Sequence, residues 1–156
     1  MANTFTQLHI QIVFSVRNRN SLIRDAWREH LHQYITGIVR NKGHKMLAIN
    51  SMPDHIHIFV GLKPDVSVSD LVRDIKANSS KWINTEKLTG IRFEWQEGYG
   101  AFSYGHSQIG DVVSYILNQQ EHHKTRTFRE EYIDFLHKFD VRYDPEYVFD
   151  LPDSEE

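Results

Sequence analysis

Cysteine is absent from the 156-residue chain, which excludes disulfide bonds and cysteine-ligated zinc. Long hydrophobic runs are also absent: the apolar stretches are too short and too polar to span a bilayer, and no signal-peptide pattern is found at the start. The chain contains neither an internal repeat nor an interior linker. We therefore expect a single-domain, cytoplasmic protein with no membrane partner.

A strong charge of either sign is missing as well. The net charge is −3, and residues 140–156 hold seven acids against the single base Arg142. The other 139 residues hold 17 Lys and Arg against 14 Asp and Glu, a balance of +3. A mildly basic body can bind nucleic acid locally, so charge alone leaves a DNA partner open. We expect one domain over residues 1–140 and an acidic, mobile tail over residues 141–156.

Hydrophobic periodicity predicts an alternation of strands and helices. Strands are expected over residues 8–16, 45–52, 55–62 and from 91 to about 104, with helices over 27–38 and 67–83 between them. Two further helices are expected, one from about 107 to 122 and one that begins at a capping box of Thr127 and Glu130. This order predicts the α+β fold class: a ferredoxin-like βαββαβ antiparallel sheet with two additional C-terminal helices.

Three glycines, Gly98, Gly100 and Gly105, fall within eight residues near the end of the fourth predicted strand and before the next helix. Glycine tolerates backbone conformations and close approaches that other residues do not. The segment either shapes a turn or sheet edge, or serves as a pivot that lets the following helix move or reach a neighbouring subunit. Both interpretations stay open at the level of the sequence.

Two histidines alternate with isoleucines in the third predicted strand. Side chains two apart share a face of a strand, so His55 and His57 lie on one side while Ile56 and Ile58 face the core. The two residues are separated by roughly 6.5 Å along the strand. That separation lets two imidazoles bind one metal ion.

A tyrosine and a glutamine, Tyr115 and Gln119, are four residues apart in the helix predicted from 107 to 122, so they share one face. Two neutral imidazoles plus an amide oxygen make an open site suited to Mg²⁺ or Mn²⁺. A tyrosine, with a reference pKa of about 10, becomes a nucleophile only when its proton is removed or its phenolate is bound. Together these groups predict metal-assisted, covalent cleavage of a phosphodiester.

The chain resembles the single-strand tyrosine transposases of the HUH superfamily, of the insertion-sequence-two-hundred type, with REP-associated tyrosine transposases as close relatives. The resemblance rests on the run 52–58, which holds His55 and His57, on the run 115–119 followed by His122 and His123, and on the segment 95–103. It implies an HUH catalytic domain over residues 1–140, with Tyr115 as nucleophile and His55, His57 and Gln119 as ligands of Mg²⁺ or Mn²⁺.

The resemblance also implies a substrate and an assembly. The substrate would be single-stranded DNA with a hairpin near each transposon end, cleaved to a 5′-phosphotyrosine and a free 3′-hydroxyl that is later rejoined. The protein would be a homodimer in which Tyr115 of one subunit can complete the His pair of the other. For DNA contacts the sequence offers Arg73, Lys76 and Lys81 on the second helix and Arg17 in the first turn, although a charged helix face is commonly only solvated.

Three alternatives remain at this point. A domesticated relative would process chromosomal repeat hairpins with the same chemistry. A hydrolase would use His55, His57 and another histidine such as His122 to bind zinc, with water as nucleophile. A ferredoxin-like module without catalytic activity would bind RNA or protein through an open sheet face.

Overall fold

The computed structural model describes residues 3–145 and 148, so the predicted tail over 141–156 lies largely outside the described residues. The domain boundary at residue 140 therefore stays a prediction. Within the described part, no helix is long and apolar enough to cross a membrane. The elements in chain order are β1 (His9–Ser15), η1 (Arg17–Arg19), α1 (Asp25–Asn41), β2 (Lys45–Met52), β3 (His55–Gly61), α2 (Val68–Thr85), β4 (Gly100–Tyr104), η2 (His106–Gln108), α3 (Ile109–Leu117), α4 (Gln119–His122) and α5 (Phe128–Lys138).

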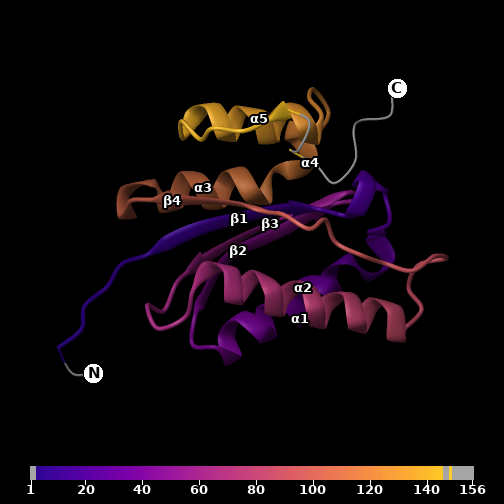
Figure 1. Ribbon diagram of the computed structural model, residues 1–156, viewed down its shortest axis with the longest axis horizontal. Coiled ribbons are helices and arrows are strands. Elements are labelled where there is room, and N and C mark those ends of the chain that lie inside the picture. The colour runs from indigo at the N-terminus through magenta and orange to yellow at the C-terminus, as the bar shows by residue number, and fades with distance from the viewer. Residues whose placement is uncertain (1–2, 146–147, 149–156) are drawn as a thin grey trace.

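The four strands form one antiparallel sheet in the order β2-β3-β1-β4, which confirms the predicted α+β, ferredoxin-like class. Figure 1 shows α1 and α2 on one face of this sheet and α3, α4 and α5 on the other. Because helices cover both faces, the described chain has no open sheet face of the kind that a ferredoxin-like binding module would use.

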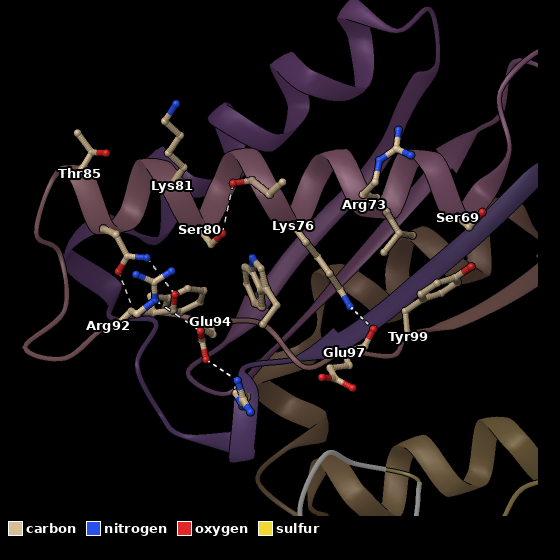
Figure 2. A pocket seen from close by; sticks show the side chains of 16 residues that line it. Ser69, Arg73, Lys76, Ser80, Lys81, Thr85, Arg92, Glu94, Glu97 and Tyr99 are labelled. Atoms are coloured by element: carbon tan, nitrogen blue, oxygen red, sulfur yellow. Dashed lines mark hydrogen bonds and ion pairs between the residues drawn. The ribbon is translucent and has the colours of Figure 1, made fainter.

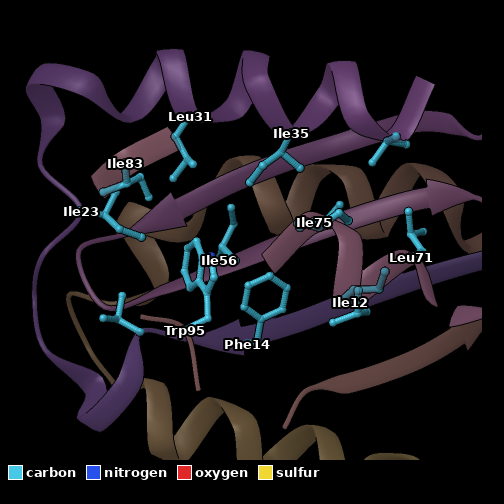
Figure 3. Close-up of a cluster of buried hydrophobic side chains, with 14 of the residues drawn as sticks. Ile12, Phe14, Ile23, Leu31, Ile35, Ile56, Leu71, Ile75, Ile83 and Trp95 are labelled. Atoms are coloured by element: carbon cyan, nitrogen blue, oxygen red, sulfur yellow. The ribbon is translucent and has the colours of Figure 1, made fainter. Parts of the chain in front are cut away.

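The face covered by α1 and α2 carries the larger hydrophobic core. Figure 3 shows Ile12, Phe14 and Ile56 of the sheet meeting Ile35 of α1 and Ile75 of α2, all fully buried. Side chains alternate across a strand, so the intervening residues of β1 and β3 point to the opposite face. That alternation sends the histidines of β3 toward α3, α4 and α5, as the sequence predicts.

The predicted fourth strand is wrong in its first half. Residues 91–96 form no strand, and only Trp95 makes an isolated bridge, to Val16. Side chains of α2 take backbone groups of this segment: Asn84 bonds both the N–H and the C=O of Phe93, and the Lys76 ammonium donates to the Gln96 carbonyl. Regular pairing with β1 begins only at Gly100.

The helix predicted from about 107 to 122 is divided. A 3-10 turn opens it, and α3 and α4 are separated at Asn118, whose backbone leaves the helical region at φ −99° and ψ 24°. Asn50 of β2 donates from its amide to the carbonyls of Ile116 and Leu117, which supplies partners for the end of α3. Gln119 still follows Tyr115 by one turn, and its amide lies 3.5 Å from the Tyr115 carbonyl.

Gly100 lies where β4 packs closely against α5. A Cβ at this position would lie 2.8 Å from Cε2 of Tyr132 and 3.0 Å from Cε2 of Phe102. We expect Gly100→Ala to lower the free energy of unfolding by about 1–3 kcal/mol through overpacking. Gly98→Ala is the control, because its Cβ would approach only the Gln96 amide nitrogen, at 3.9 Å. Equal urea midpoints for the two variants would contradict this account.

Candidate active site

The His pair lies on β3, beneath the helices α3, α4 and α5. Both imidazoles are fully buried, with Ser15 opposite His55 and Val13 opposite His57 on β1. Phe128 of α5 stacks on the His55 ring with centroids 3.9 Å apart. The two histidines therefore share one face, as their spacing predicts, and neither ring faces solvent.

Each ring is oriented by an oxygen atom at Nδ1. The Asp54 carboxylate lies 2.7 Å from Nδ1 of His55, and the Gln11 amide oxygen lies 2.8 Å from Nδ1 of His57. Facing acceptors place the hydrogen of a neutral imidazole on Nδ1, which leaves the Nε2 lone pair free. Burial lowers the pKa of His55 although the bond to Asp54 opposes it, so this ring is neutral near pH 7.

A buried carboxylate that the sequence analysis did not predict meets these lone pairs. Oε1 of Glu131, on α5, lies 3.0 Å from Nε2 of His57 and 3.6 Å from Nε2 of His55. The three ligand atoms all lie within 4.8 Å of one another. Two imidazole lone pairs facing a carboxylate oxygen repel one another unless a cation or a proton lies between them, so this donor set fits a divalent metal.

Glu131 is fully buried and ionised. Burial by itself raises the pKa of this carboxyl group, but its interactions with His57 and His123 outweigh the burial and lower the pKa. His123 Nε2 lies 3.3 Å from the same Oε1 atom. One sequence signal marks this residue: Glu131 is an acid on the apolar stripe of α5, three residues after Phe128 and four before Phe135.

Tyr115, on α3, lies next to this carboxylate in the same chain. Its hydroxyl donates to Oε2 of Glu131, and Nη2 of Arg126 lies 3.3 Å from the same hydroxyl oxygen. His122 stacks on the phenol ring with centroids 4.3 Å apart. Burial and the Glu131 charge raise the pKa of Tyr115, and Arg126 opposes that rise, so the phenol is protonated at neutral pH.

Gln119, at the start of α4, contacts both the His pair and Glu131. Its Oε1 lies 3.4 Å from Nε2 of His55, and its Nε2 donates to Oε2 of Glu131 at 3.2 Å. The four residues predicted from the sequence, His55, His57, Tyr115 and Gln119, thus lie together around Glu131. His122, the third zinc ligand of the hydrolase alternative, stacks on Tyr115 and is not part of the described His and Glu group.

The four predicted DNA-binding residues line one groove along α2, on the other face of the sheet. We call it the α2 groove; its basic residues are Arg17, Arg73, Lys76, Lys81 and Arg92. Figure 2 shows Lys76 directed toward the segment before β4, while Arg73 and Lys81 extend away from that segment. Acids reduce the charge: Glu94 lies 2.7 Å from Arg17, and Asp70 and Asp74 each lie 3.2 Å from Arg73.

The fold and the site together define an α+β protein in which a tyrosine lies beside a His and Glu group that could hold a metal ion, in a covered site. The sequence model described as "Transposase IS200 like" matches residues 4–119, and the chain therefore belongs to the IS200-like transposase family. This membership makes it an enzyme of DNA transposition. The recognised resemblance is thereby confirmed at the level of the family.

Individual relatives support the same assignment. The ISDra2 transposase TnpA of Deinococcus radiodurans is 22% identical over 121 residues, which cover 74% of this chain and 86% of that protein. A candidate transposase from D. radiodurans R1 superposes with a TM-score of 0.60 at 20% identity, over 75% of this chain and 94% of that one. A REP-associated tyrosine transposase bound to a REP hairpin superposes with a TM-score of 0.61 at 19% identity, over 99% of this chain and 95% of that one. At these identities the superpositions establish the shared fold.

Proposed function

We propose that this protein cleaves and rejoins single-stranded DNA beside hairpins at transposon ends, through a 5′-phosphotyrosine on Tyr115. One observation carries the proposal: Glu131 contacts the His pair through Oε1 and the Tyr115 hydroxyl through Oε2. The nucleophile and the metal-binding group therefore share one buried carboxylate. Membership of the transposase family supplies the substrate class, and the hairpin-bound structural neighbour favours a hairpin partner.

His55, His57 and Glu131 would hold the metal, with the Gln119 oxygen beside them. Mg²⁺ or Mn²⁺ is the proposed ion, because the carboxylate and amide oxygens suit either and substrate oxygens can fill the remaining positions beside the two imidazoles. When bound, it would withdraw charge from the scissile phosphate. Asp54 and Gln11 keep both Nε2 atoms directed at the site through their bonds to Nδ1.

Tyr115 would attack the phosphorus in line with the bond to the 3′ oxygen. The phenolic proton passes to Oε2 of Glu131, which already accepts that hydrogen bond. The Tyr115 oxygen–phosphorus bond forms, the bond from phosphorus to the 3′ oxygen breaks, and the leaving oxygen takes a proton from solvent. Because the phosphotyrosine ester retains the bond energy, a second 3′-hydroxyl can reverse the step without an external energy source.

Two basic surfaces are proposed for the DNA backbone. The α2 groove offers Lys81 and Arg92 at its exposed side. Arg17 of η1 lines this groove, and Arg19 of the same turn lines the cleft that leads to the Tyr115 side of the sheet. A single DNA strand whose path follows η1 would contact both surfaces. It would be held by contacts to its phosphates, which carry no sequence information.

Homodimerisation remains a proposal, and the arrangement of Tyr115 within one chain makes a specific prediction about it. Mixing inactive Tyr115→Phe with inactive His57→Ala protein should restore no cleavage, because each chain would carry one damaged site. An active site shared between subunits would instead form one intact site per mixed dimer. Recovery of about a quarter to a half of wild-type activity in the mixture would contradict assembly within one subunit.

The test of the proposed function uses single strands copied from the DNA on either side of the gene, labelled at one end or the other. With Mg²⁺ or Mn²⁺, the 3′ label should stay with the denatured protein and the 5′ label should be released. Labelled strands from dispersed chromosomal repeats test the domesticated alternative in the same assay. Cleavage of any of these strands without an adduct would favour the hydrolase.

A further inference from the structure

Arg126 is a cation beside the Tyr115 hydroxyl, and it has no part in the cleavage step proposed above. It lies in the loop between α4 and α5, where Nη1 is 2.7 Å from Oδ2 of Asp134 and Nη2 is 3.3 Å from the Tyr115 hydroxyl oxygen. Its side chain is 33% exposed. One end of the planar guanidinium is therefore anchored, while the other faces the attacking oxygen from the side that substrate can reach.

Arg126 lies between two clefts. It lines the cleft that contains Tyr115, Glu131 and Lys138, and it also lines a second cleft with Arg19 and Lys124. A backbone that enters through the second cleft reaches the Tyr115 hydroxyl at Arg126. The guanidinium would be the cation in contact with both the nucleophile and an arriving phosphate.

Charge explains why a cation is needed here. The carboxylate of Glu131 accepts the hydrogen bond of the Tyr115 hydroxyl and would repel a phosphodiester that arrives there. During attack the negative charge on the phenol oxygen and the equatorial phosphate oxygens increases. A guanidinium matches phosphate oxygens with two parallel N–H donors, which an ammonium group cannot do.

We propose that Arg126 is a catalytic residue that binds a non-bridging oxygen of the scissile phosphate beside Tyr115 and stabilises the charge that develops during strand cleavage. This inference rests on the proposed function, whose bond making, bond breaking and proton transfer it leaves unchanged. Asp134 holds the guanidinium through Nη1, so Nη2 remains directed at the reacting atoms.

The experiment measures the single-turnover rate of adduct formation and the strand concentration at half-saturation, using the 3′-labelled flanking strands. Arg126→Ala should slow adduct formation at saturating strand by about 10² to 10³-fold, the usual effect of losing one charge-stabilising donor. Arg126→Lys should recover only part of the rate, and added guanidinium should partly rescue Arg126→Ala. A residue with a merely structural role would show no rescue.

Arg40→Ala is the matched control, because Arg40 is an exposed arginine near the end of α1, on the other face of the sheet. It should form the adduct at the wild-type rate. Arg126→Ala within threefold of wild type at saturation would overturn the role of Arg126 and leave the proposed function intact. A wild-type protein that forms no adduct with any flanking or repeat strand would overturn both.

Discussion

Tyr115→Phe is expected to bind a single-stranded hairpin and to form no covalent adduct, with a loss of at least about 10³-fold. The substitution removes one oxygen and keeps the ring that packs against His122 and Phe135. Glu131 loses one hydrogen bond but keeps those from Gln119 and His123, so the free energy of unfolding should fall by only about 1 kcal/mol. Gel analysis after denaturation measures the adduct.

Tyr34→Phe serves as the control for Tyr115→Phe. Tyr34 lies on α1 and stacks on Trp82, on the face of the sheet away from the site. This variant should form the adduct at the wild-type rate. If Tyr115→Phe cleaved DNA normally, water or another side chain would be the nucleophile, and covalent transesterification at Tyr115 would be excluded.

His57→Ala should weaken metal binding and abolish cleavage. The substitution removes one of the two imidazole ligands and leaves the carboxylate of Glu131 without its 3.0 Å neighbour. We expect cleavage to fall by at least about 10³-fold and Mn²⁺ affinity by at least about 10-fold, measured by calorimetry. Chelator should inhibit the wild type, and Mg²⁺ or Mn²⁺ should restore its activity.

His32→Ala separates metal loss from the general cost of removing a buried histidine. The His32 imidazole is also buried, but it bonds the Ser51 hydroxyl, and α1, which carries it, covers the face of the sheet away from the site. This variant should lose stability and still bind Mn²⁺ with wild-type affinity. Normal cleavage by a correctly folded His57→Ala protein, or equal Mn²⁺ affinity in both variants, would remove the metal role of the His pair.

The sequence predicted those parts of the site that local periodicity controls. A period of two placed His55 and His57 on one face, and a spacing of four placed Gln119 one turn after Tyr115, even though the helix between them breaks at Asn118. Glu131 was missed because its partners are 74 and 16 residues away and only the tertiary fold brings them together. An acid on an apolar helical stripe is the local signal that indicates such a residue.

The fold, like the site, was predictable where local hydrophobic periodicity controls it. The fold class follows from the order of strands and helices along the chain, which hydrophobic periodicity predicts. The first half of the fourth strand failed as a prediction because Phe93 and Trp95 alternate like strand residues, while Asn84 of α2 takes both backbone groups of Phe93 and only Glu94 and Gln96 bond the backbone at the end of β1. Sequence periodicity indicates which side chains are buried. It does not indicate which groups form hydrogen bonds with the backbone N–H and C=O groups.

Peptide mapping of the wild-type adduct tests directly whether Tyr115 is the nucleophile. Protein incubated with Mg²⁺ and a 3′-labelled single strand is denatured, digested and analysed by mass spectrometry. We expect the DNA mass to be attached to the peptide containing Tyr115 through a 5′-phosphate. Attachment at any other residue, or cleavage that leaves no attached strand, would contradict this expectation.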